Sequence, residues 1–407
     1  MAIAFPKPSN LWKVVDLFSG CGGMSAGFSA HKDFFLIVGA VDREVAKPGR
    51  GKNKANSTRC NATYHRNIGI QPKNADLTTL NPRVYREELG LEKEELDVLI
   101  ACPPCTGFSQ KNSKNHLKDD PRNRLVERTA AFIEEFMPEF FVMENVKELL
   151  RGKNQHHFHK LCHRLETLNY SMNASIHELS NYGLPQRRER ALAIARRDRG
   201  FLGDYPLKPV AKKRTVWDTI ARLPVVNAGE VHPSDSMHVS PGMTSTVRSR
   251  IQAIPKDGGS WGDIMNNPHL SYEEKHRLLI PSMFRARPGS FPDVYGRLKW
   301  HSIAATITRE CSHVGNGRYV HPEQDRLLTV REMSLLQGFP ANYFFEGPIS
   351  AKYNQIGDAV PPSISTQIAQ YIIQLKLDRD KIKTHPHLSS TYEVTHQLNL
   401  LEGITVR

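Results

Sequence analysis

The first 200 residues alternate between short apolar runs and segments with helical spacing. Apolar, β-branched runs occupy residues 13–18, 34–41, 96–101, 140–143 and 191–195. Between them, apolar side chains in residues 121–136 and 158–168 recur about every 3.6 positions, as on one face of a helix. Strands that alternate with helices predict an α/β fold with a doubly wound, mostly parallel sheet. In such sheets, ligands bind beyond the carboxyl ends of the strands.

The pattern changes near residue 200. Residues 200–300 are richer in Pro, Gly, Ser and His and show weak periodicity, which predicts a second, smaller and irregular domain. Helical spacing returns at residues 327–336, where Thr329 is a suitable N-cap with Glu332 three positions later, and again at residues 363–375. We therefore predict a first domain over residues 1–199 that residues 352–380 complete, a second over residues 200–351, and a tail over residues 381–407.

Composition narrows the class of protein. The chain has 407 residues, of which 39% are hydrophobic and 24% charged, as in ordinary globular proteins. Lys and Arg outnumber Asp and Glu by 55 to 42, and a net charge of +13 favours a polyanionic partner such as nucleic acid over a merely soluble basic protein. No run approaches the about 20 apolar residues of a membrane span, and no secretory signal is visible. Six cysteines are too few for a disulfide scaffold, so we expect a cytoplasmic protein.

A glycine cluster follows the first apolar run. Residues 19–23 read Ser-Gly-Cys-Gly-Gly, and glycines between a strand and a helix let a cofactor approach the backbone closely. Asp42 ends the second run, where a carboxylate can accept hydrogen bonds from ribose hydroxyls. Ser25 stands where a dinucleotide motif has its third glycine, so S-adenosylmethionine fits at least as well as NAD. The alternative is a tight turn without a ligand.

Two cysteines separated by two prolines follow the third run. Cys102 and Cys105 have the spacing of a redox pair or of half a metal site, but the chain has no second such pair. The third interpretation is one catalytic thiolate on a loop at a strand end, since a thiolate is a strong nucleophile. Buried structural cysteines are the alternative without chemistry.

Two further motifs carry charged groups. Glu144 ends a buried strand, where a carboxyl group can act as a general acid; it can equally cap the next helix. Gln186, Arg188 and Arg190 share one face of an extended segment, so two guanidinium groups can hold a carboxylate, a phosphate or a pyrimidine carbonyl. A solvated run of charges is the alternative.

One cluster of potential metal ligands lies within eight residues. No distant partner residues accompany it, so we interpret these side chains as solvent-facing and predict no metal ion. The cluster comprises His156, His157, His159, Cys162 and His163.

Together, these motifs resemble the cytosine-C5 DNA methyltransferase family over about residues 12–375. The family's signatures appear in order: Asp16-Leu-Phe-Ser-Gly-Cys-Gly-Gly, Pro103-Pro104-Cys105, Glu144-Asn145-Val146, and Gln186-Arg187-Arg188-Glu189-Arg190. The last two are Arg331-Glu-Met-Ser-Leu-Leu-Gln-Gly-Phe-Pro340 and Gln355-Ile-Gly-Asp-Ala-Val-Pro-Pro362.

The resemblance implies a Rossmann-like enzyme that transfers a methyl group from S-adenosylmethionine, leaving S-adenosylhomocysteine, to C5 of a flipped-out cytosine in a short sequence of double-stranded DNA. It implies that Cys105 attacks C6, that Glu144 protonates or hydrogen-bonds N3, and that Arg188 holds the base carbonyl and positions Glu144. Gln186 and Arg190 complete the catalytic set. The implied cofactor residues are Phe18, Ser19, Gly20, Cys21, Gly22, Gly23, Asp42, Arg43, Asp76, Leu77, Pro104, Asp358 and Val360.

The resemblance also sets partners and alternatives. The resemblance is to the prokaryotic restriction-modification type of this family, because no large extension precedes the motifs. It implies a nucleoid-associated protein that acts on DNA as a monomer, and a cognate restriction endonuclease as a candidate partner. Two departures are Asp358, where the family usually has Asn, and an insertion over residues 47–56. The competing functions are a tRNA cytosine methyltransferase, a catalytically silent DNA-binding homologue, and a thiol–disulfide oxidoreductase.

Overall fold

A computed structural model describes residues 7–44, 57–104, 119–200, 202, 207–287 and 289–384. Cys105, the insertion over residues 47–56 and most of the predicted tail lie outside the described residues.

Within the described residues, seven strands form one sheet in the order β3-β2-β1-β4-β5-β7-β6. β1 to β5 run parallel, and β7 is antiparallel to both of its neighbours. The predicted mostly parallel, doubly wound sheet is confirmed, and each predicted strand is present with small shifts of its ends. The strands are β1 Trp12–Leu17, β2 Phe35–Asp42, β3 Lys73–Asn74, β4 Val98–Ala101, β5 Phe140–Val146, β6 Ser171–Glu178 and β7 Glu189–Arg196.

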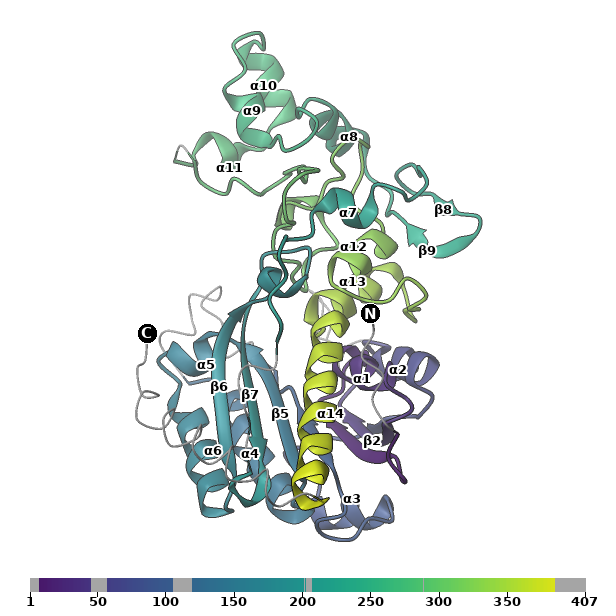
Figure 1. Cartoon of the computed structure of the whole chain (residues 1–407). Helices are drawn as coiled ribbons and strands as arrows, with labels where there is room; N and C mark the ends of the chain where they lie inside the picture. The colour runs from purple at the N-terminus through teal and green to yellow at the C-terminus, as the bar shows by residue number, and fades with distance from the viewer. Residues whose placement is uncertain are drawn as a thin grey trace.

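Helices cover both faces of the sheet because successive side chains of a strand point to opposite faces. Val14 packs in a core with α1 (Gly23–Ser29) and α14 (Pro362–Thr384), whereas Val15 packs in a second core on the other face. In Figure 1, α14 runs along the sheet beside α1, although the two helices are far apart in sequence. The helices of the second core are α3 Pro82–Glu88, α4 Arg124–Phe136, α5 Glu148–Arg151 and α6 His156–Thr167. A further helix, α2 Cys60–Ile68, contacts α1 and β2.

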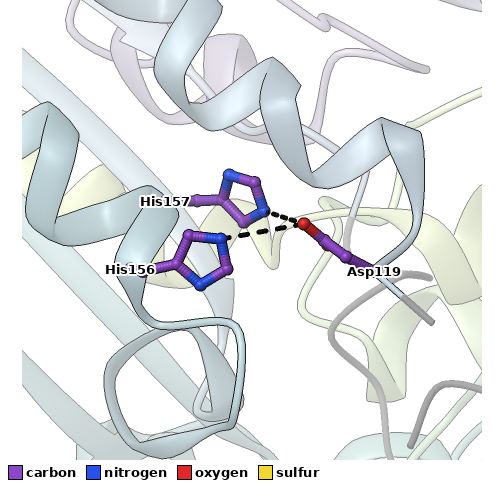
Figure 2. Close-up of side chains that lie close together, drawn as sticks. All are labelled: Asp119, His156 and His157. Atoms are coloured by element: carbon purple, nitrogen blue, oxygen red, sulfur yellow. Dashed lines mark hydrogen bonds and ion pairs between the residues drawn. The ribbon is translucent and has the colours of Figure 1, made fainter. Parts of the chain in front are cut away.

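The start of α4 differs from the sequence prediction. Residues 121–123 form a short 3₁₀ turn, η2 (Pro121–Asn123), and the α-helix begins only at Arg124. Asp120 still caps this turn, because its Oδ1 accepts the Arg122 backbone N–H at 3.0 Å. Asp119, just before the turn, faces two histidines at the start of the neighbouring helix α6 (Figure 2).

The segment after residue 207 is built from short helices and one small hairpin. In Figure 1, α8 to α11 stand at the end of the molecule farthest from the sheet, and α12 and α13 lie nearer to it. A separate hydrophobic core holds this segment together, with Trp261, Tyr295 and Met333 among its members. The elements are α7 Val216–Ile220, β8 Val231–His232, β9 Asp235–Val239, α8 Ser245–Gln252, α9 Trp261–Met265, α10 Tyr272–Leu278, α11 Pro281–Phe284, α12 Val330–Leu336 and α13 Ile349–Asp358.

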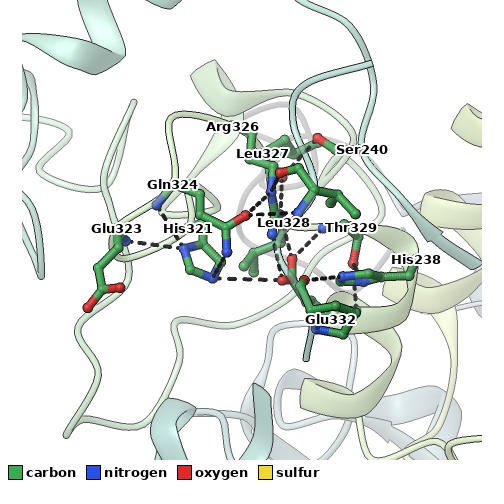
Figure 3. Close-up of polar contacts among 12 residues, drawn as sticks. His238, Ser240, His321, Glu323, Gln324, Arg326, Leu327, Leu328, Thr329 and Glu332 are labelled. Carbon is green, nitrogen blue, oxygen red and sulfur yellow. Dashed lines mark hydrogen bonds and ion pairs between the residues drawn. The ribbon is translucent and has the colours of Figure 1, made fainter. Parts of the chain in front are cut away.

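The predicted cap of α12 is confirmed, and it belongs to a buried polar network (Figure 3). Thr329 and Glu332 form the reciprocal capping box. Glu332, whose side chain is only 1% exposed, also accepts hydrogen bonds from both terminal nitrogens of Arg326, at 2.7 and 2.8 Å. Burial lowers the pKa of the adjacent His321 to about 4, so this imidazole is neutral near neutral pH and its Nδ1 accepts the Glu323 backbone N–H. The network fixes the helix start without leaving a buried charge unpaired.

Candidate active site

The sequence motifs meet at one edge of the sheet. The turn after β1, the end of β2, the loop after β4 and the end of β5 all lie where parallel strands end. Because β7 is antiparallel, its beginning reaches the same edge, with Arg190 opposite Val146. The fold therefore brings the glycine cluster, the Cys102–Pro104 segment, Glu144 and the arginine run together.

The structure divides the glycine cluster into two kinds of position. A Cβ on Gly22 would lie 2.8 Å from the Tyr343 hydroxyl, and one on Gly23 would lie 2.3 Å from the carbonyl oxygen of Val360. These two glycines are needed for packing within the protein. Gly20, with a φ of +53°, has no atom within 4 Å of its Cβ position, so it is the glycine that leaves space for a ligand.

The other predicted cofactor residues near the glycine cluster include both buried and partly exposed side chains. The side chains of Cys21 and Leu77 are buried in the hydrophobic cores, at 3% and 4% exposure. Ser19 is buried as well, whereas Phe18 is partly exposed and has a left-handed φ of +62°. We conclude that Cys21 and Leu77 can offer a ligand their backbone atoms only.

Asp42 lies against the glycine turn. Its Oδ2 accepts the backbone N–H of Gly20 at 2.9 Å. Burial raises the pKa of Asp42 to about 6; the Gly20 N–H opposes this shift, and the nearby carboxylates of Glu44 and Asp358 add to it. Asp42 and Asp358 are therefore close enough for the charge of one carboxylate to influence the other.

Asp76 and Arg43 form an ion pair at the adjacent strand end, with Arg43 Nη1 2.6 Å from Asp76 Oδ2. The Thr78 hydroxyl donates to Asp76 Oδ1 at 2.7 Å and is the main cause of a lowered pKa for this carboxyl. Asp76 is thus an ionised acceptor beside the Asp42 strand.

Asp358 ends α13 and is exposed, and its carboxylate pairs with Arg309. Arg309 escaped the sequence analysis, and no sequence signal joins it to a residue 49 positions later. The pair compensates the extra charge that Asp brings where the family usually has Asn. Val360 is buried against Gly23, and Pro104 is exposed at the mouth of the loop.

Glu144 lies near the end of β5 at 7% exposure. Arg190 Nε is 3.0 Å from Glu144 Oε1, so the carboxylate has a cationic partner. The next residue, Asn145, donates from Nδ2 to the carbonyl oxygen of Pro103 at 3.0 Å. This bond holds the loop that leads to Cys105 beside Glu144, a role that the sequence motif alone did not reveal.

Arg188 does not lie on Glu144, contrary to the sequence-based expectation. Its guanidinium is 3% exposed and donates to the carbonyl oxygens of Ile307 and Ala359, at 3.0 and 3.2 Å. Gln186 is likewise buried and donates to the Leu336 carbonyl at 3.0 Å. The predicted alternation is confirmed, since Arg187 and Glu189 are exposed, but the inward side chains reach different partners. Among the described residues, the arginine that forms an ion pair with Glu144 is Arg190.

The surroundings of Cys102 favour the neutral thiol over the thiolate. Burial, helped by the nearby charge of Glu144, raises the pKa of Cys102 well above its ordinary value. A redox pair needs an accessible thiolate, so the oxidoreductase interpretation loses its support.

The sequence profile of the C-5 cytosine-specific DNA methylases matches residues 12–374, most of the chain. The chain belongs to this family. The predicted family is thereby confirmed, and the protein is a DNA cytosine-5 methyltransferase.

Named relatives agree with this assignment. The methylase is 31% identical to the type II methylase M.HgiDII of Herpetosiphon aurantiacus, across 88% of this chain and 94% of that protein. It is 29% identical to the type II methyltransferase M1.HphI of Haemophilus parahaemolyticus, across 89% and 86% of the two chains. Among solved structures, a prophage-encoded E. coli protein described as a DNA modification methyltransferase has a TM-score of 0.66 at 21% identity, across 89% of the methylase and 99% of that chain. At this identity, the structural match supports the fold alone.

Among the helices that the structure describes, none is both long and apolar enough to cross a membrane.

Proposed function

We propose that the methylase transfers a methyl group from S-adenosylmethionine to C5 of a flipped-out cytosine within a short, specific sequence of double-stranded DNA. The observation that carries this proposal is the convergence of Glu144, Arg190 and the Pro103 loop at the edge of the sheet beside the open glycine turn.

The cofactor residues fit S-adenosylmethionine. Gly20 leaves open space next to Asp42, whose carboxylate is set to accept the ribose hydroxyls. Asp76 lies farther along the edge, where an acceptor suits the adenine amino group, and Asp358 and Val360 stand at the methionine end. The cofactor supplies a methyl group on a sulfonium, and the chain's own residues prepare the base to receive it.

The reaction that we propose begins with Cys105, which lies outside the described residues. Its thiolate forms a bond to C6 of cytosine. The electron pair of the C5–C6 double bond shifts to the C4–C5 bond and that of the N3–C4 double bond moves onto N3, where Glu144 supplies a proton or a hydrogen bond. C5 thereby becomes the nucleophilic carbon of an enamine. C5 then forms a bond to the methyl carbon as the bond between that carbon and the sulfonium sulfur breaks, which leaves S-adenosylhomocysteine. A base such as water takes the C5 proton, the Cys105 thiolate leaves C6 as the C5–C6 double bond re-forms, and N3 returns its proton to Glu144. General-acid assistance of this kind contributes about 10²–10⁴-fold to a rate.

Arg190 replaces Arg188 in the role of holding Glu144 and the base carbonyl. Its guanidinium is charged at all relevant pH values and reaches Glu144 directly. Arg188 and Gln186 instead bind backbone groups of the chain that returns from residues 304–359. We propose that they hold this segment against the catalytic edge.

DNA binding rests on charge and on the segment after residue 200. We propose that residues 200–351 form the domain that recognises the target sequence, with residues 1–199 and 352–380 as the catalytic domain. A net charge of +13 favours a polyanion, and binding should weaken steeply as salt rises. The relatives named as type II enzymes support a restriction-modification role. We further propose a cognate endonuclease, action as a monomer on DNA and a location on the cytoplasmic nucleoid.

The test uses the purified full chain, S-adenosylmethionine, and genomic DNA without 5-methylcytosine, with total tRNA in parallel. We expect mass spectrometry to find 5-methylcytosine in DNA and sequencing to place it in one short context, with no product from Cys105→Ser. Product in tRNA alone would move the activity to the RNA class. No product from either substrate, with S-adenosylhomocysteine still bound, would favour a silent homologue.

A further inference from the structure

The start of α6 brings two histidines to one carboxylate oxygen (Figure 2). His157 Nε2 lies 2.8 Å from Asp119 Oδ2, and His156 Nε2 lies 3.7 Å from the same atom. Asp119 comes from the chain just before η2, 37 residues ahead of His156, so it is the distant partner that the histidine cluster lacks in the sequence. Three potential metal-ligand atoms therefore converge from two segments.

Each of the two inner ligands is oriented by another side chain. Glu127 Oε1 lies 2.5 Å from Nδ1 of His157, and Asn123 donates from Nδ2 to Oδ1 of Asp119 at 2.7 Å. In this arrangement His157 Nε2 and Asp119 Oδ2 face each other at 2.8 Å, and His156 Nε2 faces the same oxygen at 3.7 Å. In metal sites, a ligating histidine commonly donates its other ring N–H to a carboxylate, which fixes the tautomer and the ring orientation.

The spacing and the chemistry suit a small transition-metal ion. Ligands about 2.1 Å from a tetrahedral zinc ion lie about 3.4 Å from one another. The distances of 2.8 and 3.7 Å bracket this value, so only small side-chain movements are needed. Two imidazoles and one carboxylate favour zinc over magnesium or calcium, which prefer oxygen ligands. His156 is 50% exposed, which gives the ion a path from solvent and leaves room for water as a fourth ligand.

We infer that Asp119, His156 and His157 bind a divalent transition-metal ion such as zinc, with Glu127 and Asn123 as supporting residues. The ion ties α6 to the chain directly after residues 105–118, the segment that contains Cys105. This revises the expectation that the protein has no metal. It is independent of methyl transfer, because none of these residues belongs to the proposed catalytic set.

A second arrangement accounts for part of the geometry without an ion. A protonated His157 that bridges Glu127 and Asp119 explains the two short distances, but it assigns no role to His156. The two arrangements differ in a measurable way. A metal site needs neutral imidazoles, so metal affinity falls as pH decreases and removal of His156 abolishes binding.

The experiment titrates the chelator-treated full chain with Co²⁺, whose visible absorption bands report low-coordinate nitrogen and oxygen ligands, and then displaces it with Zn²⁺. Thermal unfolding with and without Zn²⁺ gives a second readout. The variants are His156→Ala and Glu127→Gln, and the matched control is His159→Ala, an exposed histidine of the same helix that is not one of the three proposed ligands.

We expect one equivalent of Co²⁺ to give the bands, and Zn²⁺ to raise Tm, in the wild type and in His159→Ala. His156→Ala should lose both signals, and Glu127→Gln should bind about 10–100-fold more weakly. The inference is overturned if the wild type shows neither signal, or if His156→Ala binds as the wild type does. DNA methylation is assayed on the same samples, so an active enzyme without metal binding refutes this site and leaves the proposed function intact.

Discussion

Arg188 and Arg190 are two positions apart in one motif, yet the structure gives them different tasks. Arg190 contacts Glu144, whereas Arg188 binds backbone carbonyls of the returning chain. We predict that Arg190→Ala chiefly removes methyl transfer and that Arg188→Ala chiefly removes stability. Arg187→Ala is the matched control, because this arginine of the same motif is exposed.

A lower bound on the cost of Arg188→Ala follows from its hydrogen bonds to the carbonyl oxygens of Ile307 and Ala359. The Ile307 carbonyl loses a buried donor, which costs about 1–3 kcal/mol. The Ala359 carbonyl keeps a donor, since Gln337 also donates to it at 2.8 Å, so this loss costs nearer the about 0.5–1.5 kcal/mol of one net hydrogen bond. The free energy of unfolding should therefore fall by at least about 2–4 kcal/mol.

We expect Arg190→Ala to lower the rate of methyl transfer more than it lowers stability. The pair with Glu144 is only partly shielded, with 15% and 9% side-chain exposure, so its loss should destabilise the protein by about 1–3 kcal/mol, between surface and buried ion pairs. A general acid out of position forfeits much of its about 10²–10⁴-fold contribution, so kcat per folded molecule should fall about 100-fold. Arg190→Lys keeps the charge and should recover part of this loss.

The assay combines urea unfolding with single-turnover methylation of DNA, at a temperature where every variant is folded. We expect Arg188→Ala to retain a rate per folded molecule within about tenfold of Arg187→Ala. The reasoning is refuted if Arg188→Ala abolishes this rate while Arg190→Ala preserves it, because Arg188 would then be the residue acting on Glu144 or the base.

Three further predictions test other parts of the site. Gly23→Ala places a Cβ 2.3 Å from the Val360 carbonyl oxygen, and overpacking of this kind costs about 1–3 kcal/mol or more, which thermal unfolding will measure. The proposed role of Asp42 is to accept hydrogen bonds from the ribose hydroxyls as a carboxylate, and burial raises its pKa to about 6. Calorimetry should therefore find that the affinity for S-adenosylhomocysteine is constant well above pH 6 and falls up to tenfold per pH unit below it. A pH-independent affinity would contradict this role. Glu332→Gln breaks the buried pair with Arg326 and should lower stability by about 3–5 kcal/mol in urea unfolding without changing the methylated sequence.

Most strands of the sheet could be predicted because they are visible in the sequence as short apolar runs. β1, β4 and β5 are mostly buried on both faces, and β2 is mostly buried apart from one exposed residue near its start, so all four are continuous apolar runs in the sequence. β6 was missed because its residues 171–178, Ser-Met-Asn-Ala-Ser-Ile-His-Glu, have neither an apolar run nor clear alternation at the sheet edge. The short helices α7 to α11 were missed individually, since helices of four to eight residues have too few turns for a period to show.

The site could be located from the sequence, but not its internal contacts. Motifs at strand ends converge because parallel strands end at one edge, and this needs only the fold. The partners of each side chain depend on the returning chain, as when Arg309 pairs with Asp358 or Tyr343 donates to the Cys21 carbonyl at 2.6 Å. Sequence spacing contains no information on such long-range pairs.

The glycine cluster shows how a correct location can rest on an incomplete reason. All three glycines were expected to give a cofactor access to the backbone, yet only Gly20 faces open space. Gly22 and Gly23 lack a Cβ and so leave room for Tyr343 and Val360, which belong to the chain after residue 340 that packs against this turn. The same turn therefore serves two purposes: one glycine leaves room for the ligand, and two let the returning chain pack beside it. A substitution at Gly22 or Gly23 would then disturb cofactor binding only through the fold, whereas one at Gly20 would act on the ligand directly.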